Sequence, residues 1–376
     1  MIAVNARHLL KDRLEGCGYF VQETFRVLAA AHPGHRFYFL LDRPQESPEG
    51  FSPNVQFMFA GPAARHPLLW KIWFDLRIPL MLKKIKAEVF VSPEGFASLT
   101  TRVPQCLVVH DLGFLHYPET YKKLHVLYMR HMTPSFIKKA KQVATVSEFS
   151  KSDIIKQYGT DPQKIDVVFN GVKDVFRPID PITQQRTRDE FTGGKDFFIY
   201  VGALQPRKNL VNLLRAFSVF KKRQQSSMKL VLTGRLAWKN EDFLQKLHTY
   251  KYRDDVVLTD YLDEELLARL LGSAYALVYP SLFEGFGVPV LEAMKCGVPA
   301  LTSKDSSMQE IAGAAGLYFD PNDHQDMAEQ LMRIYKDEQL RGQLVEQGLQ
   351  KAKEYTWQRT AALLWESMMK AAASVH

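Results

Sequence analysis

The stretch SLFEGFGVPVLEAMKCGVP, residues 281–299, decides how the second half of this 376-residue chain folds. An apolar run at 276–279 precedes it and predicts a buried strand. The glycines predict a turn that leads into a helix with Pro289 in its first turn. Unpaired N–H groups and the positive end of the helix dipole favour phosphate at such a helix start. The sequence therefore predicts a phosphate cradle.

Two glutamates, Glu284 and Glu292, lie on either side of this turn. Gly285 and Gly287 leave room for a ligand to approach the backbone. A carboxylate about one turn into the helix can accept hydrogen bonds from the vicinal hydroxyls of a ribose. The pattern indicates a nucleotide-sugar site, and the alternative is an ordinary loop and helix with two surface glutamates.

The string from Glu284 to Glu292 resembles the E-x7-E signature of retaining glycosyltransferases with the GT-B fold. The chain is thereby similar to glycosyltransferase family 4, also called glycosyl transferases group 1. The resemblance implies a metal-independent hexosyltransferase without a cofactor, whose substrate is a nucleotide diphosphosugar. It also implies that Glu292 binds the ribose and that Glu284 holds the transferred sugar. Backbone contacts to the donor are expected at Gly285, Phe286, Gly287 and Val288.

A second motif, YVGALQPRKNL at 200–210, follows another predicted strand. Gly202 permits a tight turn, and Arg207 and Lys208 lie at the entrance to a helix. Fixed cations in such a place stabilise the charge of a departing diphosphate. The string resembles the donor-diphosphate loop of the same family, which implies catalytic roles for both cations. A basic surface turn is the alternative.

Two motifs in the first half extend the resemblance. His110, in the string VVHDLGF, resembles the family histidine that contacts the transferred sugar, although a strand-end histidine can also be structural. Gly16 and Gly18 resemble the glycine loop beside the donor phosphates. This loop lacks the full dinucleotide fingerprint G-x-G-x-x-G.

Short apolar runs alternate with helical patterns and predict an α/β fold. We expect two Rossmann-like, doubly wound domains that face each other across a cleft, the GT-B arrangement. Residues 1–178 would form an acceptor-side domain and 179–356 a nucleotide-sugar-binding domain, with a helix at about 357–376 packing back on the first. Strands are expected at 2–5, 37–41, 55–59, 89–92, 106–110, 143–147, 165–170, 197–201, 229–233, 256–259, 276–279, 300–302 and 317–319.

Composition narrows the class of protein. An apolar content of 46% and a charged content of 24% are typical of a globular domain. No apolar run approaches the roughly 18 residues that span a bilayer, and the N-terminus lacks the pattern of a secretory signal. The three cysteines are scattered and predict neither a disulfide framework nor a metal cluster. We expect a cytoplasmic protein.

The charge is uneven along the chain. Residues 1–178 contain 24 Lys and Arg against 16 Asp and Glu, whereas the remainder contains 25 of each, so the whole excess of +8 lies in the first half. This predicts an anionic partner there: a phosphate-bearing acceptor, the inner face of the plasma membrane or nucleic acid. No nucleic-acid-binding module is recognisable, so we expect no nucleic acid.

Several segments leave two interpretations open. Residues 67–86, with two tryptophans and a basic end, predict a helix on the first sheet that is interrupted at Pro79. The alternative is a helix on a membrane surface. The lysines at 122–123 and 138–141 predict solvated faces or an acceptor-side basic patch. The pair Asp254-Asp255 precedes a strand and predicts a loop rather than a metal site.

Taken with the resemblance, these features predict transfer of a sugar to a glycan or lipid-linked acceptor in cell-surface polysaccharide synthesis. The string that contains His110 is similar to that of related mannosyl- and glucosyltransferases, and from this resemblance we favour GDP-mannose as the donor. The alternatives are a GT-B nucleotide-sugar epimerase or phosphorylase, or a non-enzymatic nucleotide- or nucleic-acid-binding module.

Overall fold

The computed structural model describes residues 1–10, 14, 16–45, 48–235 and 241–373. The chain divides into two compact units: unit 1 is 1–171 with 356–376, and unit 2 is 172–355. The chain thus leaves unit 1 after Gly171, ahead of the predicted boundary after Pro178. The reason is that the next residues pack within unit 2, where the Val172 N–H bonds to the Tyr355 carbonyl at 3.3 Å.

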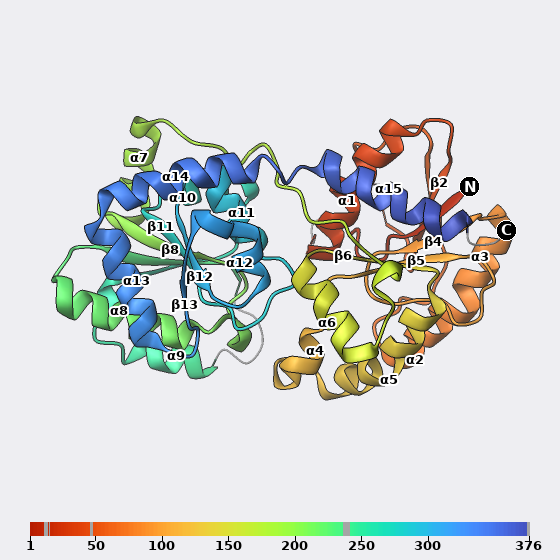
Figure 1. Ribbon diagram of the computed structural model, residues 1–376, viewed down its shortest axis with the longest axis horizontal. Coiled ribbons are helices and arrows are strands. Elements are labelled where there is room, and N and C mark those ends of the chain that lie inside the picture. The colour runs from red at the N-terminus through yellow and green to blue at the C-terminus, as the bar shows by residue number, and fades with distance from the viewer. Residues whose placement is uncertain (11–13, 15, 46–47, 236–240, 374–376) are drawn as a thin grey trace. The chain divides into compact units, whose positions relative to one another are not determined.

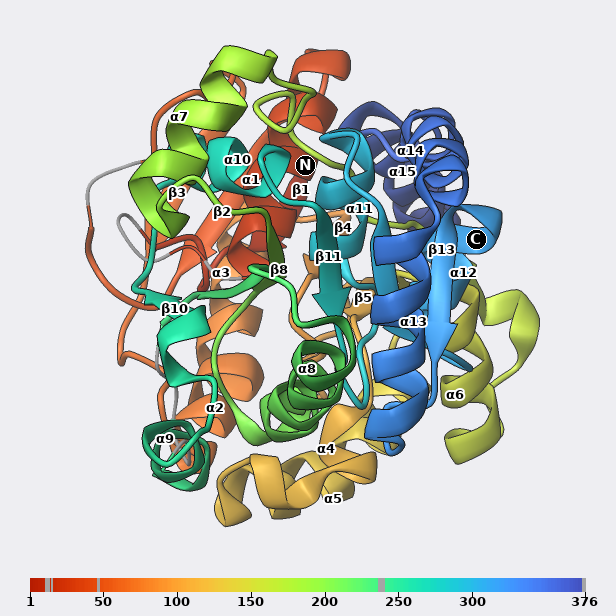
Figure 2. The ribbon, with the colours of Figure 1, turned by 90° about the vertical axis from the view of Figure 1, so that its left-hand side faces the viewer.

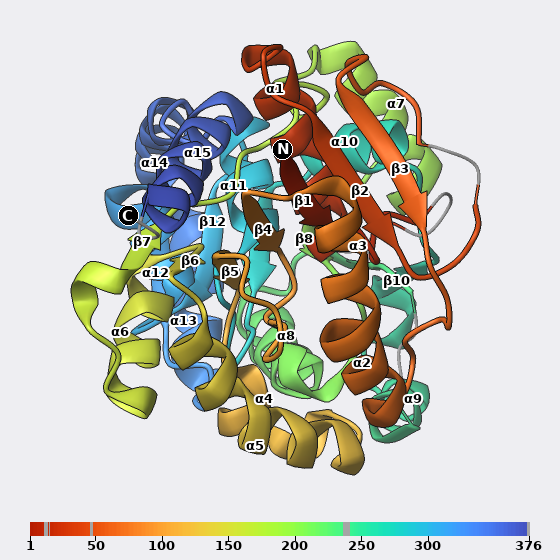
Figure 3. The ribbon, with the colours of Figure 1, turned by 90° about the vertical axis from the view of Figure 1, so that its right-hand side faces the viewer.

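Unit 1 contains a seven-stranded parallel sheet in the order β3-β2-β1-β4-β5-β6-β7 (Figure 3). Most of its strand residues are buried, as expected for parallel strands covered on both faces. The strands are β1 Ile2–Asn5, β2 Phe37–Leu41, β3 Val55–Phe59, β4 Val89–Ser92, β5 Gln105–Val109, β6 Gln142–Thr145 and β7 Ile165–Val167.

Unit 2 contains a six-stranded parallel sheet in the order β10-β9-β8-β11-β12-β13 (Figure 2). Every strand in both sheets overlaps a predicted one, and the predicted α/β class is confirmed. The strands are β8 Phe197–Val201, β9 Lys229–Thr233, β10 Val256–Thr259, β11 Ala276–Tyr279, β12 Ala300–Ser303 and β13 Gly316–Phe319.

The strand order reverses once in each sheet, between β1 and β4 in unit 1 and between β8 and β11 in unit 2. In doubly wound sheets, ligands bind beyond the carboxyl ends of the strands at this switch point. The loops that follow β8 and β11 carry the two motifs of the second half. The strand order therefore brings these motifs together.

Helices cover both faces of the unit 1 sheet (Figure 1). The last of them, α15, packs on α1 and on strands β4 to β7. Residues 374–376, the end of the predicted C-terminal helix, lie outside the described residues. The helices are α1 Gly16–Ala31, α2 Pro67–Ile72, α3 Ile78–Ile85, α4 Gly113–His116, α5 Lys123–Lys139, α6 Glu148–Tyr158 and α15 Trp357–Ala373.

Several helices of unit 2 begin at a residue whose side chain caps the helix. Asp263 caps α10 by accepting the Leu266 N–H. Asparagine is a common helix N-cap, and Asn209 in the string at 200–210 would be expected to cap α8. That expectation is wrong: Asn209 precedes α8 in a left-handed conformation (φ 60°), and its side chain donates to the Pro321 carbonyl at 2.6 Å instead. The helices are α7 Pro181–Thr192, α8 Leu210–Gln224, α9 Glu241–His248, α10 Glu264–Gly272, α11 Val288–Lys295, α12 Ser307–Ala312, α13 His324–Lys336 and α14 Glu338–Ala352.

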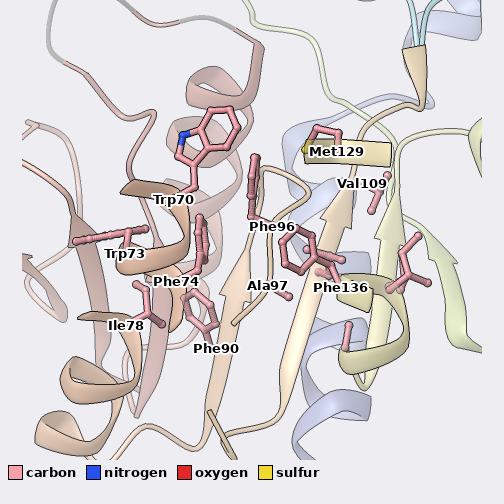
Figure 4. Close-up of a cluster of buried hydrophobic side chains, with 14 of the residues drawn as sticks. Trp70, Trp73, Phe74, Ile78, Phe90, Phe96, Ala97, Val109, Met129 and Phe136 are labelled. Carbon is pink, nitrogen blue, oxygen red and sulfur yellow. The ribbon is translucent and has the colours of Figure 1, made fainter. Parts of the chain in front are cut away.

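The helix at 67–85 belongs to the core of unit 1. Trp70 and Trp73 are buried in a cluster with Phe74 and Phe96 (Figure 4), so the membrane-surface interpretation of the two tryptophans is wrong. The predicted interruption at Pro79 is confirmed, because α2 ends at Ile72 and α3 begins at Ile78 with Pro79 in its first turn. A π-turn joins α2 to α3. Because Pro79 has no N–H, it cannot donate the usual helical hydrogen bond to the Asp75 carbonyl. The Thr100 hydroxyl donates to that carbonyl instead, at 2.6 Å. Within the described ranges, no helix is both long and apolar enough to cross a bilayer.

Candidate active site

Two loops at the switch point of unit 2 form a compact charged cluster. The loop after β8 supplies Arg207 and Lys208, and the loop after β11 supplies Glu284. Lys208 Nζ forms an ion pair with Glu284 Oε1, and Arg207 Nη1 lies 3.6 Å from Glu284 Oε2. The Leu282 N–H donates to the Arg207 carbonyl at 2.9 Å and ties the loops together. The structure thus brings together three residues that the sequence predicted separately.

Lys208 is buried, with 7% of its surface exposed. Its ammonium group donates to the Tyr279 hydroxyl at 2.7 Å and lies 5.1 Å from the centre of that ring. Tyr279 in turn stacks on Tyr200, with ring centres 5.8 Å apart. The sequence analysis missed both tyrosines, although each belongs to a strand that ends at one of the motifs. They hold the ammonium group in a fixed position.

Glu284 is held in its ionised form. Burial alone would raise the pKa of its carboxyl, but Arg207 and Lys208 lower the pKa to about 2. The Ser281 hydroxyl also donates to the carboxylate, and Ser307 donates to the Glu284 backbone carbonyl at 2.7 Å. With two cations and one carboxylate, the cluster carries a net positive charge. Such a cluster attracts an anion while its own geometry stays fixed.

The turn after Glu284 leads into α11 as predicted. Gly287 adopts a left-handed conformation (φ 99°), and a Cβ there would lie 2.5 Å from Met308, so only glycine fits. No side chain within the described ranges caps the start of α11. The side chain of Phe286 is buried against Tyr355, with ring centres 5.7 Å apart. A ligand could therefore contact the backbone of Phe286 but not its ring.

Glu292 lies on α11 and is half-buried. Burial and the neighbouring Glu264 raise the pKa of its carboxyl to about 8, and Lys173 offsets part of that effect. Lys173 instead forms an ion pair with Glu264 at 2.7 Å. A desolvated carboxyl with a raised pKa is typical of a ligand-binding group. The sequence analysis missed Lys173 and Glu264, which are distant from Glu292 in the sequence.

In unit 1, His110 follows β5 directly. Its Nε2–H donates to the Pro93 carbonyl at 2.9 Å, and its ring also hydrogen-bonds the Cys17 side chain. Burial would lower the pKa of His110, but Cys17 and the Pro93 carbonyl raise it to about 9. The Cys17 thiol in turn has a lowered pKa, because it faces the His110 imidazole and the charge that this ring can carry.

The glycines of the first-half loop differ from one another. A Cβ on Gly18 would lie 2.5 Å from the His8 carbonyl, so packing alone requires a glycine there. A Cβ on Gly16 would meet no atom within 4 Å. In unit 2, Gly202 has a positive φ of 144° and a Cβ would lie 2.9 Å from the Tyr200 hydroxyl. Of these three predicted donor-binding glycines, Gly16 is the one with open space beside it.

A second charged cluster lies at the switch point of unit 1, where the side chains of Arg7 and Glu94 are buried and that of His8 is exposed. Glu94 follows β4, and Arg7 and His8 follow β1. Arg7 Nε donates to Glu94 Oε1 at 3.0 Å, and His8 Nε2 lies 2.6 Å from Glu94 Oε2. Burial alone would raise the pKa of Glu94, but Arg7 and His8 bring it well below its usual range. The sequence analysis missed this cluster, although charged residues directly after buried strands were a usable signal.

The predicted loop at Asp254-Asp255 is a short 3-10 turn, Arg253–Asp255. Asp255 is bound by Lys221 and Lys229, each at 2.9 Å, and so it has a structural role. Within the described residues, no group of three or more His, Cys, Asp or Glu side chains is arranged to hold a metal ion.

Comparison with known proteins agrees with this geometry. Residues 181–351 match the family described as glycosyl transferases group 1, and residues 15–175 match glycosyltransferase family 4. The two matched regions cover most of both units. The chain belongs to glycosyltransferase family 4. Family 4 enzymes are retaining and have the GT-B fold, so the catalysed reaction is glycosyl transfer.

Two curated mannosyltransferases match this chain over about three quarters of both lengths. It is 28% identical over 299 residues to O-antigen chain mannosyltransferase B of Escherichia coli, covering 78% of each chain. It is 26% identical to O-antigen chain mannosyltransferase RfbU of Salmonella typhimurium, covering 75% of each. Sucrose-phosphate synthase from Thermosynechococcus elongatus superimposes with a TM-score of 0.82 over 99% of both chains at 19% identity. This last likeness confirms the predicted GT-B fold.

Proposed function

We propose that this family 4 enzyme transfers a mannosyl group, with GDP-mannose as the favoured donor, to a growing cell-surface polysaccharide. The acceptor would be a glycan or a lipid-linked glycan on the cytoplasmic side of the membrane. The similarity to two O-antigen mannosyltransferases over about three quarters of the chain supports mannose. The observation that carries the proposal is the coupled cluster of Arg207, Lys208 and Glu284 at the switch point of unit 2.

In this proposal the cluster acts on the donor diphosphate. Negative charge grows on the leaving diphosphate as the glycosidic bond breaks, and Lys208 and Arg207 are already fixed where a positive charge is needed. Glu284 keeps both cations in place and contributes contacts to the transferred sugar. The net positive charge of the cluster makes a metal ion unnecessary for this role, so we propose metal-independent transfer.

The other proposed roles belong to the turn after Glu284, to helix α11 and to the loops of unit 1. The backbone of 285–288 and the start of α11 would bind phosphate oxygens, with Gly202 beside them. Glu292 would accept hydrogen bonds from the ribose hydroxyls. In unit 1, His110 would orient the transferred sugar through its charge, because its ring nitrogens already bond Pro93 and Cys17, and the loop at Gly16 and Gly18 would lie beside the donor. The departing phosphate would help to deprotonate the acceptor on the same face of the sugar.

The experiment is a donor screen with the purified protein. GDP-mannose, UDP-glucose and other nucleotide sugars are incubated separately, and released nucleotide diphosphate is followed by chromatography. We expect slow hydrolysis of GDP-mannose, and faster transfer with retained anomeric configuration when a mannan-type acceptor is added. Interconversion of nucleotide sugars without release of the nucleotide would indicate an epimerase, and release from UDP-glucose alone would contradict the mannose assignment.

We also propose peripheral contact with anionic membrane, on the basis of the +8 excess in the first half of the chain. Attraction of this kind is screened by salt. Sedimentation with anionic and with neutral vesicles at low and high salt tests it. Binding only to anionic vesicles, and only at low salt, is expected, and equal, negligible binding to both would contradict it.

A further inference from the structure

Five cations surround a cavity of about 820 Å³ in unit 1. The cavity is formed by the segments that lead into β5, β6 and β7, together with the end of α5. Its volume is in the range of ordinary small-molecule sites. The cations that line it are Arg102, Lys138, Lys139, Lys141 and Lys164.

The cavity lies at the edge of the sheet opposite the predicted site residues of unit 1. Arg102 precedes β5 and His110 follows it. Because β5 has five residues and a strand rises about 3.3 Å per residue, these two edges are about 16 Å apart. The cavity is therefore separate from the residues proposed to bind the donor.

The positions of the lysines at 122–123 and 138–141 bear on whether they form one basic patch. Lys123 begins α5 and Lys139 ends it. A 17-residue helix is about 25 Å long. The single acceptor-side patch considered from the sequence is therefore wrong, since the lysines at 122–123 and those at 138–141 lie at opposite ends of this helix.

None of the five cavity cations forms an ion pair with a carboxylate in the described part of the chain. Two lysines of unit 2, Lys221 and Lys229, give a contrast, because both pair with Asp255. Clustered like charges repel one another, so leaving five of them unpaired costs stability unless an anion binds.

Lys164 shows this crowding directly. It is half-buried, and its Nζ donates to the Lys138 carbonyl at 3.1 Å, at the end of α5. Burial and the nearby Lys141 lower the pKa of its ammonium group. The one carboxylate at the cavity, that of Asp161, already accepts the Gln163 N–H at 2.9 Å.

The charge balance of the cavity indicates how much negative charge its ligand carries. Five cations face one carboxylate and the end of a helix, which carries about half a negative charge. About three and a half positive charges are left over by this count. A neutral sugar does not balance them, whereas a molecule with several phosphate groups does.

We propose that this cavity binds a ligand that carries two or more phosphate groups. The proposal is independent of the transferase activity, because it uses no residue of the Arg207–Lys208–Glu284 cluster. It gives the positive charge of the first half of the chain a defined location at the amino edge of the sheet. The phosphate groups can belong to a soluble polyphosphate or to the headgroups of anionic lipids, and the experiment separates these two sources.

The test is residue-specific amine acetylation read by mass spectrometry on the full-length protein. Tripolyphosphate is the soluble probe, with sodium chloride at equal ionic strength as its control. At a probe concentration about ten times the dissociation constant, acetylation of Lys141 and Lys164 should slow about tenfold, because only unbound protein reacts. Lys83 and Lys84 are exposed on α3 and serve as internal controls whose rates should not change.

A matched pair of variants strengthens the test. Lys138→Ala with Lys141→Ala removes two charges from the cavity, and Lys83→Ala with Lys84→Ala removes two charges from α3. Protection of Lys164 by tripolyphosphate should be lost in the first variant and kept in the second. Protection by phosphatidylglycerol vesicles but not by tripolyphosphate would identify lipid headgroups as the source.

Unchanged reactivity of Lys141 and Lys164 with both probes would overturn the proposal. Equal slowing at Lys83 and Lys84 would do the same, because it would show general screening. Since Lys208 reports on the cluster of unit 2 in the same spectra, failure at the cavity is distinguishable from failure of the proposed donor site.

Discussion

The two units of this glycosyltransferase place a similar charged cluster at the same topological position. In unit 2, Glu284 follows β11 and binds cations that follow β8. In unit 1, Glu94 follows β4 and binds cations that follow β1. In both sheets these are the two strands that flank the switch point. The shared feature is a buried carboxylate that holds cations at the place where doubly wound sheets bind ligands.

The clusters differ in the kind of cation that they use. Unit 2 pairs its carboxylate with a guanidinium and an ammonium group, those of Arg207 and Lys208, and groups of these types ordinarily have pKa values far above neutral. Unit 1 pairs Glu94 with Arg7 and with His8, whose pKa is raised by Glu94 against the lowering effect of burial. The difference teaches that a histidine makes part of the charge at unit 1 depend on pH near neutrality.

The largest effect should come from removing each carboxylate. Glu284→Gln and Glu94→Gln each leave a buried cation without its partner, which typically costs about 3–5 kcal/mol of stability. The folded pKa of Glu284, about 2, lies below its ordinary value of 4.5, so its stabilisation is present above pH 4.5 and is lost as the pH falls toward 2. Urea unfolding at pH 7 and pH 3 measures this.

In that experiment the stability gap between Glu284→Gln and wild type should narrow at pH 3. The Glu94→Gln variant should behave in the same way if the two clusters are equivalent. A variant as stable as wild type at pH 7 would show that its carboxylate does not balance the neighbouring cations.

The next effect separates a catalytic lysine from a structural one. Lys208 and Lys221 are equally buried, at 7% exposure, and each is paired with a carboxylate. Lys208→Met should reduce kcat about a hundredfold or more, because contacts of this type are worth about 3–4 kcal/mol in the transition state. Lys221→Met should lower Tm and leave kcat nearly unchanged.

Steady-state kinetics of both variants decide between these roles. Addition of EDTA should leave the wild-type rate unchanged. Equal losses of kcat in the two variants would assign Lys208 a structural role only. A strict requirement for a divalent metal would show that the site's positive charge comes from elsewhere.

A smaller effect concerns the pH dependence of Glu292, the carboxylate proposed to bind the ribose hydroxyls. The folded pKa of Glu292, about 8, lies above its ordinary value of 4.5, so stability should fall as the pH rises from 4.5 to 8. Glu292→Gln removes this slope and should raise Tm at pH 8. Donor affinity of the wild type should weaken by up to about tenfold per pH unit below pH 8, because the carboxylate must be ionised to accept from both hydroxyls.

Calorimetric titration with the donor at pH 6, 7, 8 and 9 measures the affinity, and thermal melts measure the stability. Glu292→Gln should bind weakly at every pH. A wild-type affinity that is constant from pH 6 to 9 would show that Glu292 is not the ribose ligand.

The smallest effect concerns a second histidine of unit 1 whose charge depends on pH, His110. Cys17→Ser should lower the pKa of His110 from about 9 toward its ordinary 6.5, because the thiol that favours the imidazolium is gone. Since the folded pKa of His110 is the higher one, its contribution to stability is complete below pH 6.5 and is lost as the pH rises through 9. NMR titration of the imidazole measures the shift.

Cys106→Ser is the matched control, because Cys106 lies on β5, is buried, and has a pKa raised to about 12 by burial. It should leave the titration of His110 unchanged. Identical His110 titrations in Cys17→Ser and wild type would remove the thiol as the cause of the shift.

The sequence by itself determined the strands and the turn that begins α11, and it indicated the charged residues of the two loops in unit 2. Parallel strands covered on both faces are continuous apolar runs, so each run at the predicted places became a strand. The glycine turn before α11 and Pro289 in its first turn are local features that need no partner from elsewhere in the chain. The string from Glu284 to Glu292 was sufficient to identify the family.

Only the tertiary structure decided which of these residues meet. Lys208 and Glu284 are 76 positions apart and become a pair because β8 and β11 are neighbours in the sheet. The pairing of Arg7 with Glu94 depends in the same way on β1 lying beside β4. Strand order is set by the packing of whole helices and strands and not by local preference. For that reason the sequence indicated the charged groups, but not their partners or their pKa values.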